Sequence, residues 1–181
     1  TAGSAMITTD GGQVAGATGA ITRFFGNSTA GTSTLITNGG LGNDGQVLFS
    51  GDAGGSTARA ITNLGGIFDV SGLTPAGMSI GSIEGAGSYR LGSKNLSVGG
   101  NNLSTAVSGV IQDAGASIGT GGSLTKVGSG TFTLSGANTY TGSTAINTGK
   151  VIVNGALANG PVTVASGATL VLYDGSPSFP D

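Results

Sequence analysis

Hydrophobic residues in the second half of the chain alternate with polar ones over short segments. The clearest pairs, each separated by one residue, are Phe132/Leu134, Val151/Val153 and Leu170/Leu172. Alternation with a period of two is typical of a strand that buries one face. Runs rich in Gly, Asn and Ser separate the pairs, and these residues favour sharp turns. Helices are disfavoured because each interior Gly costs a helix about 1 kcal/mol relative to Ala.

The three pairs recur at one constant interval, because Val151 lies as far beyond Phe132 in the chain as Leu170 lies beyond Val151. A second set, Ile146 and Val164, recurs at an interval shorter by one position. Antiparallel hairpins closing into a sandwich or barrel are one interpretation, but they require no equal spacing. A chain that coils in one direction stacks like residues on like residues. The spacing therefore favours a parallel β-solenoid.

The first half repeats more loosely, with Ile36-Thr37-Asn38 recurring as Ile61-Thr62-Asn63. Further strands are predicted at residues 45–49, 66–70, 89–91, 96–98 and 107–111. We predict one β-solenoid over residues 1–175, with about nine rungs of roughly 19–25 residues and a length of roughly 40–45 Å. Within it, residues 1–120 form irregular rungs and 121–175 regular 19-residue rungs, while 176–181 form a tail.

Composition supports a folded chain without strongly charged partners. The 181 residues include 38 Gly but only 8% charged residues, with a net charge of −2 and a mean hydropathy of +0.25. These values lie outside the polar, highly charged range of disordered proteins. The absence of Cys excludes disulfides and thiolate metal sites. The small charge disfavours nucleic acid, and no apolar run reaches the length of a membrane helix.

The reactive side chains suggest no chemistry. Without His or Cys, the usual general bases and thiol nucleophiles are absent. Pairs of carboxylates could still cleave a polysaccharide, but the eight acids are scattered, and we interpret them as solvated. They are Asp10, Asp44, Asp52, Asp69, Glu84, Asp113, Asp174 and Asp181. We therefore predict no catalytic, cofactor-binding or metal-binding residues, and no enzyme.

Three other patterns have structural interpretations. Residues 39–47 resemble a calcium-binding nonapeptide, but Gln46 occupies its apolar position and tandem copies are missing, so a Gly-rich corner is the better interpretation. The Gly-rich segments 51–55 and 119–122 lack the Lys-Ser/Thr of a phosphate loop. An aromatic platform for a carbohydrate or peptide is an alternative use of Phe24, Phe25 and the three tyrosines, with the Tyr140 hydroxyl expected in solvent.

Residues 121–155, GGSLTKVGSGTFTLSGANTYTGSTAINTGKVIVNG, resemble the passenger-associated repeat of bacterial autotransporters. Residues 80–111 are similar to the segment that often precedes that repeat, and the Ile-Thr-Asn units are similar to another passenger element. The resemblance implies a right-handed, single-stranded parallel β-helix exported through the outer membrane of a Gram-negative bacterium. It further implies a C-terminal outer-membrane β-barrel in the full-length parent, and a repeat that assists secretion and folding.

Three functions follow as expectations. The first is a non-catalytic fragment of a cell-surface passenger, acting as stalk or scaffold and in adhesion to a host surface or carbohydrate. The second is self-association through the strand edges at the solenoid ends, and the third is an enzyme acting on polysaccharide. The expected partners exclude nucleic acid, and we expect no membrane insertion by this piece of the passenger.

Overall fold

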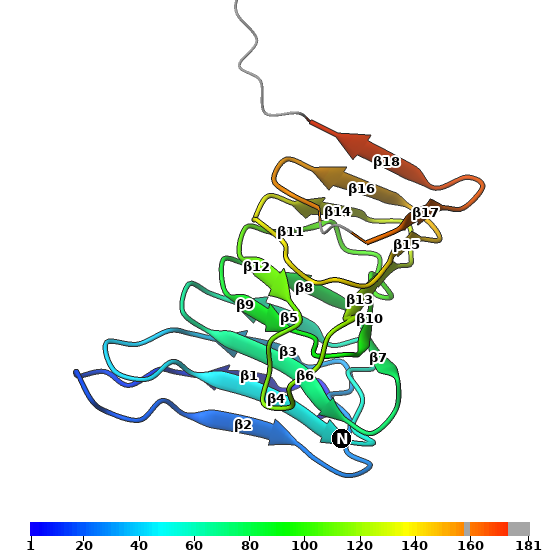
Figure 1. Ribbon diagram of the computed structural model, residues 1–181. Coiled ribbons are helices and arrows are strands. Elements are labelled where there is room, and N and C mark those ends of the chain that lie inside the picture. The colour runs from blue at the N-terminus through cyan, green and yellow to red at the C-terminus, as the bar shows by residue number, and fades with distance from the viewer. Residues whose placement is uncertain (158–159, 174–181) are drawn as a thin grey trace, which may run out of the picture.

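The computed structural model describes residues 1–157 and 160–173. Within them the chain forms eighteen short strands and no helix, and every strand pairing is parallel. Figure 1 shows the strands stacked in successive turns of a single coil, from β1 near the N-terminus to β18 at the opposite end. The parallel β-solenoid is therefore confirmed, and the sandwich and the barrel are excluded.

Side one of the coil runs along its whole length. It consists of two four-stranded sheets in the orders β1-β3-β5-β8 and β11-β14-β16-β18. A parallel bridge between Gly85 and Val107 joins them. The strands are β1 (Met6–Thr9), β3 (Thr34–Thr37), β5 (Arg59–Thr62), β8 (Ser82–Glu84), β11 (Thr105–Val107), β14 (Thr131–Leu134), β16 (Lys150–Val153) and β18 (Thr169–Leu172).

Counted along side one, side two belongs to the first five turns and side three to the third and later turns. The strands of side two are β2 (Ile21–Phe24), β4 (Gln46–Gly51), β6 (Ile67–Leu73), β9 (Ser88–Arg90) and β12 (Val110–Gln112). The strands of side three are β7 (Gly77–Ile80), β10 (Asn95–Val98), β13 (Ser123–Lys126), β15 (Thr144–Ile146) and β17 (Val162–Val164). The cross-section thus changes from two sides to three and then back to two.

The coil completes about seven turns, fewer than the about nine predicted from a unit of roughly 20 residues. The difference arises in the rungs before the repeat, where Met6 pairs with Thr34, Thr34 with Arg59 and Thr105 with Phe132. These partners lie further apart in the sequence than Thr131 and Lys150, which pair at the interval predicted for the regular rungs. Insertions at the corners therefore lengthen the early rungs.

The register predicted for the second half is confirmed residue by residue. Phe132 pairs with Val151 and Val151 with Leu170, and Ile146 pairs with Val164. In the first half, Ile36 pairs with Ile61 as the Ile-Thr-Asn repeat predicted. Burial alternates along these strands, since one face of each strand points into the coil.

One predicted strand was wrong. Residues 107–111 form the end of β11 and the start of β12 on different sides of the coil, with a corner at Ser108 and Gly109 between them. Gly109 permits this corner because an added Cβ would lie 1.8 Å from the carbonyl oxygen of Gly87 in the turn below. The sequence prediction also missed β1, β2, β7, β8 and β13.

Aromatic side chains fill the interior of the first four turns. Phe24 stacks on Phe49 with ring centres 4.7 Å apart, and Phe68 and Tyr89 continue the column at 5.4 and 5.8 Å. Ile111 pairs with Tyr89 in the last strand of side two. All five side chains are buried. This aromatic column, defined here as Phe24, Phe49, Phe68 and Tyr89, gains stability from apolar burial and from favourable ring contacts.

Candidate functional site

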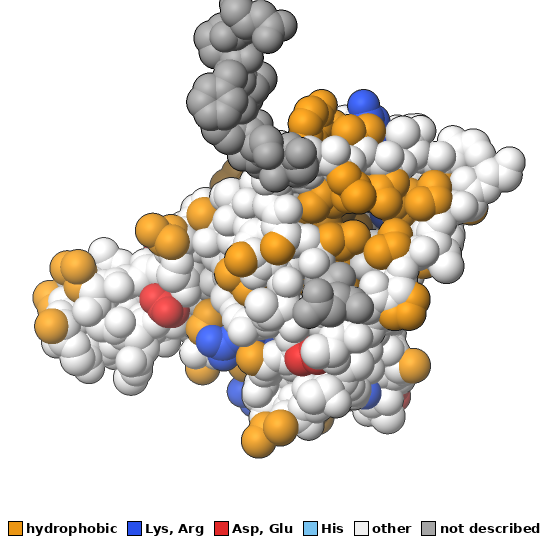
Figure 2. All heavy atoms as spheres, turned by 45° about the horizontal axis from the view of Figure 1, so that its top comes forward, with side chains coloured by type: hydrophobic (Ala, Val, Ile, Leu, Met, Phe, Trp, Pro, Cys, Tyr) orange, Lys and Arg blue, Asp and Glu red, His pale blue; other side chains and the backbone are white. Residues whose placement is uncertain are grey.

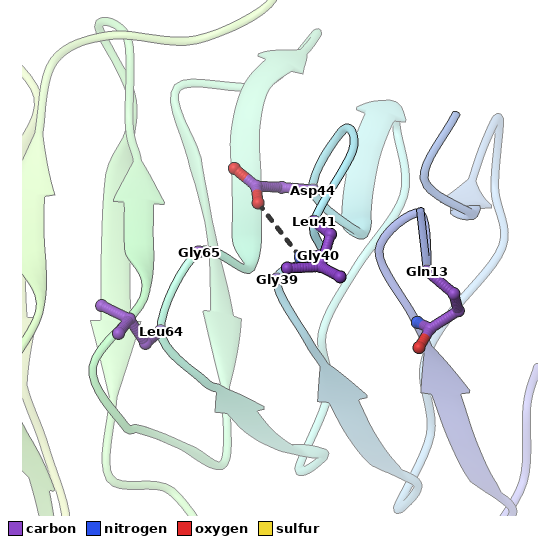
Figure 3. Close-up of a pocket in the computed structure, with 7 residues that line it drawn as sticks. All are labelled: Gln13, Gly39, Gly40, Leu41, Asp44, Leu64 and Gly65. Atoms are coloured by element: carbon purple, nitrogen blue, oxygen red, sulfur yellow. Dashed lines mark hydrogen bonds between the residues drawn. The ribbon is translucent and has the colours of Figure 1, made fainter. Parts of the chain in front are cut away.

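A shallow hollow of about 410 Å³ lies on the corners of the first three turns. Figure 3 shows its lining: Gln13, Gly39, Gly40, Leu41, Asp44, Leu64 and Gly65. Leu41 and Leu64 are 80% and 79% exposed. The backbone N–H of Gly40 donates a hydrogen bond of 3.4 Å to Asp44 Oδ1. The hollow therefore combines exposed aliphatic side chains with one carboxylate.

The nonapeptide-like segment at residues 39–47 forms part of this corner. A Cβ on Gly39 would lie 2.4 Å from the carbonyl oxygen of Leu64, and one on Gly40 would lie 2.5 Å from the N atom of Gly12. These glycines let three turns approach one another, which supports the interpretation as a Gly-rich corner. Among the residues that the structure describes, no group of three acids could hold a metal ion.

Two of the acids expected in solvent have a different role. Asp69 is buried, and its carboxylate accepts hydrogen bonds of 2.8 Å from the backbone N–H groups of Ser71 and Ala116. Asp113 accepts from the N–H groups of Gly121 and Gly122 and from Thr141, whose Oγ1 lies 2.6 Å away. The two carboxylates hold residues 113–122, which run back over side two in Figure 1.

Within the described part of the chain, the remaining acids form no carboxylate pair suited to glycoside cleavage. Glu84 forms an ion pair with Arg59, and Asp10 accepts a hydrogen bond of 2.6 Å from Asn38. Asp44 lines two neighbouring hollows whose linings include no second carboxylate, and Asp52 lies beyond β4. Asp174 and Asp181 lie outside the described residues.

The aromatic residues do not form a platform. Tyr89 is buried and donates its hydroxyl proton to the Glu84 carbonyl oxygen. Tyr140 was expected to expose its hydroxyl, but it is 1% exposed and bonds Thr144 Oγ1 at 2.5 Å. Burial raises the pKa of both phenols. Of the five candidates only Phe25 and Tyr173 are exposed, in the first and last turns respectively.

Tyr140 and its neighbour Asn138 close the end of side two. The Asn138 side-chain oxygen accepts the N–H of Ile111 at 3.0 Å, and its amide nitrogen donates to Gly136 O and Ala156 O. The N–H of Thr139 donates to the carbonyl oxygen of Ile111. A buried side chain thus takes the place of the next strand above β12 and satisfies its backbone groups.

Lys126 is the last residue of β13, and its side chain bonds the corner between β13 and β14. Its side chain is buried, and Nζ donates to the carbonyl oxygens of Val127 at 2.7 Å, Gly128 at 2.8 Å and Thr148 at 3.4 Å. Desolvation lowers the pKa of this lysine, and the carbonyl oxygens oppose that shift because they favour the charged form.

Sequence reasoning identified neither Lys126 nor Asn138 as a functional residue. The signal for Lys126 was its position two residues after Leu124, where alternation predicts an inward-facing side chain. Asn138 offered no comparable signal, because it bonds Ile111 only where side two stops after β12. The local sequence does not show where side two stops.

The last turn exposes hydrophobic residues at positions whose partners in the preceding turn are buried. Val162, Val164 and Leu172 are exposed, and Leu170 is half-buried. Figure 2 turns this end toward the viewer and shows hydrophobic side chains gathered there. Strand β18 pairs with β16 on one side alone among the described residues. The end of the coil therefore offers an apolar face beside a strand edge.

The continuous coil of parallel strands defines a class of protein, the parallel β-solenoids. A family model described as Passenger-associated-transport-repeat matches residues 124–153. The chain is also 38% identical over 124 residues, 68% of its length, to the "Adhesin BmaC autotransporter" of Brucella suis biovar 1 (strain 1330). It belongs to the autotransporter passengers and is a homologue of that adhesin.

The matched region spans 3% of the length of that relative. No solved structure matches the chain significantly. Membership in this family implies secretion to the cell surface and a translocator domain in the parent protein. Passengers of adhesin autotransporters are typically non-catalytic. In the described part of the chain, no helix is long and apolar enough to cross a membrane.

Proposed function

We propose that this chain is a non-catalytic stalk segment of a passenger exported through the outer membrane of a Gram-negative bacterium. Its task is to hold adhesive surface away from the cell, and its C-terminal repeat assists secretion and folding. The observation that carries this proposal is the unbroken ladder of side one from β1 to β18. Such a ladder lets each folded turn template the next.

The repeat is suited to setting the alignment of the turns around it. Three of its buried polar residues, Lys126, Asn138 and Thr144, have hydrogen-bond partners within the corners. Asn138 and Lys126 also bond neighbouring turns, at Ile111 and Ala156 and at Thr148 respectively. Misaligned turns would break these bonds, at about 1–3 kcal/mol for each buried group left unpaired. The correct alignment of the turns is therefore favoured over shifted alignments. A segment that starts ordered folding requires such a preference.

The test is surface display of the parent passenger carrying Ile146→Asp. Ile146 is buried within the coil, so the new carboxylate would disrupt β15 because an unpaired buried charge is strongly unfavourable. We expect display to fall strongly, measured by antibody labelling of intact cells. Asn147→Asp adds the same charge at the exposed neighbouring position and should leave display intact. Unchanged display of the Ile146→Asp passenger would contradict the role in secretion.

The adhesive part of the proposal draws on the name of the relative and on the corner hollow. Exposed Leu41 and Leu64 beside Asp44 give a surface that a host protein or carbohydrate could contact. Cells displaying the Leu41→Ser/Leu64→Ser passenger should adhere less to host cells than cells displaying the wild type. If cells that display equal amounts of the variant and of the wild-type passenger adhere equally, this surface does not contribute to adhesion.

A second candidate function is self-association through the ends of the coil. Among the described residues, the apolar face of the last turn is exposed and β18 pairs with β16 alone. Both observations favour self-association, because unpaired edges accept strands from other chains. End-to-end contacts of this kind grow as filaments. Light scattering of the 181-residue chain over a concentration series tests it, and a monomer at the highest concentration would exclude it.

A further inference from the structure

Lys126 stands in a column of otherwise apolar residues inside the coil. It pairs in register with Val98 in the turn below and with Ile146 in the turn above. All three side chains are at most 1% exposed. A lysine in this position needs a specific compensation, since burying an ammonium group without partners is strongly unfavourable.

The compensation comes from backbone oxygens alone. The three carbonyl groups that accept from Nζ belong to Val127, Gly128 and Thr148, and an ammonium group has three protons to donate. Within the described residues, the one ion pair joins Arg59 and Glu84. Carbonyl oxygens converging on a cation are the arrangement by which proteins hold monovalent cations.

Glycines in neighbouring turns leave the space that the ammonium group occupies. A Cβ on Gly149 would lie 2.8 Å from Nζ, and one on Gly99 would lie 3.2 Å away. Both glycines have positive φ, 73° and 110°, which other residues rarely adopt. The ammonium group therefore lies among the corners of three successive turns, at residues 99, 127–128 and 148–149.

We propose that the carbonyl oxygens of Val127, Gly128 and Thr148 form a binding site for a primary ammonium ion, which Lys126 fills from within the chain. Its occupation links the corner after β13 to the corner after β15 through the hydrogen bond of 3.4 Å to the Thr148 carbonyl oxygen. The inference rests on the fold alone and is independent of any role of the repeat in secretion. The alternative is that Lys126 contributes only the packing of its methylene stem.

The absence of Cys from the chain allows a direct test. In Lys126→Cys, alkylation of the unfolded chain with 2-bromoethylamine forms a C–S bond with loss of bromide and restores an ammonium group at the end of a lysine-like side chain. Alkylation with 1-bromopropane gives a neutral side chain of the same length. Both products are refolded, and their urea midpoints are compared by circular dichroism.

We expect the aminoethyl product to unfold near the wild-type midpoint. The propyl product should have an unfolding equilibrium constant roughly 10–100-fold larger, because it leaves buried carbonyl groups without a donor. Equal midpoints would overturn the ammonium site and leave packing as the role of Lys126. Lys150→Cys treated with the same two reagents is the control, since Lys150 lies on β16, is half-buried, and faces away from the core.

A measurement on the unaltered chain decides the question if neither product refolds. An ammonium group held by three carbonyl oxygens exchanges its protons slowly, so Lys126 Nζ should give an observable ¹⁵N-coupled resonance near neutral pH. Its absence under conditions where the backbone spectrum is complete would overturn the proposal. In Lys126→Ala, ammonium chloride should raise the urea midpoint more than sodium chloride at the same concentration, and equal effects of the two salts would count against the site.

Discussion

The early turns that hold the aromatic column, called the wide turns below, and the turns of the C-terminal repeat fill their interiors with different side chains. In the early turns, where paired residues such as Met6 and Thr34 lie far apart in the sequence, the aromatic column fills the interior. In the repeat, where paired strands follow at a shorter interval, Phe132 and other apolar side chains fill the interior. The corners of the repeat are completed by the polar side chains of Lys126 and Asn138.

The difference separates two contributions to a solenoid. Apolar burial in the wide turns stabilises the coil but tolerates changes of rung length, because burial has no direction. Side chains that bond neighbouring turns, such as Asn138 with Ile111 and Ala156, favour one alignment because a shift would break these bonds. We infer that the wide turns provide most of the stability and the repeat most of the specificity. The predictions below test this division, beginning with the largest expected effect.

Phe68→Ala tests the wide turns. Phe68 is fully buried between Phe49 and Tyr89, so its removal should lower the free energy of unfolding by about 3–5 kcal/mol. Urea denaturation followed by circular dichroism measures the loss. Phe25→Ala removes the same ring from a position 70% exposed and should change stability little. A small effect at Phe68 would contradict the importance of the aromatic column.

Asn138→Ala tests the polar closure of side two. The N–H of Ile111 would lose its acceptor, and we expect a loss of about 1–3 kcal/mol. Asn154→Ala is the matched control, since Asn154 is exposed and the hydrogen bond at this position uses its backbone N–H. Hydrogen exchange of the Ile111 amide should accelerate in the first variant alone. Unchanged protection there would show that Asn138 does not close the strand.

Alkaline pH tests both regions, since Tyr89 lies in the wide turns and Tyr140 in the repeat. Burial raises the pKa of both phenols above that of the unfolded chain. The folded state therefore keeps protons that the unfolded state releases above pH ~10. Stability present below that pH should fall as pH rises, by up to about 1.4 kcal/mol per tyrosine and pH unit.

The measurement is the urea midpoint at pH 9 and pH 11 for the wild type, Tyr89→Phe and Tyr140→Phe. Each substitution should reduce the loss between the two pH values. Lys126 acts in the opposite direction, because its pKa is lowered in the folded state. Between that pKa and the ordinary lysine pKa, the unfolded chain keeps a proton that the folded chain has lost, so stability rises with pH. Comparing each variant with the wild type cancels that contribution. An undiminished loss in both variants would exclude the tyrosines as its cause.

Arg59→Met tests the outer surface of the wide turns and should have the smallest effect. The Arg59 side chain is partly exposed where it pairs with Glu84, and such pairs contribute about 0–1 kcal/mol. A loss below about 1 kcal/mol at low salt, vanishing at high salt, would agree with stability that resides in the core. A larger, salt-independent loss would show that this surface ion pair contributes substantially to the free energy of unfolding.

Sequence alone predicted the architecture wherever strands recur at equal spacing. The columns through Phe132 and Ile146 were visible because each corner in the repeat has nearly the same length. Side two was seen only in fragments, because its stacked residues Ile21, Gln46 and Ile67 follow one another at unequal intervals. Corners of unequal length make the register of the strands unrecognisable in the sequence, although the strands pair regularly in the structure.

The polar residues of the repeat were beyond sequence reasoning for a different reason. Tyr140 was expected at the surface because it lies in a Gly- and Thr-rich corner, yet the end of side two leaves a space above Ile111 that this corner fills. The burial of such a residue is decided by where another side of the coil stops. No local pattern contains that information.

The changing number of sides determines how the coil would respond to tension along its axis. Backbone hydrogen bonds between turns point along that axis, so a pulling force is shared by all strand pairs in one cross-section. Between the fourth and fifth turns three sides share the force, through β8–β11, β9–β12 and β10–β13. Between the sixth and seventh turns two strand pairs share it, β14–β16 and β15–β17. A stretched filament of this design should therefore part within a two-sided section, such as its repeat, before its three-sided middle gives way.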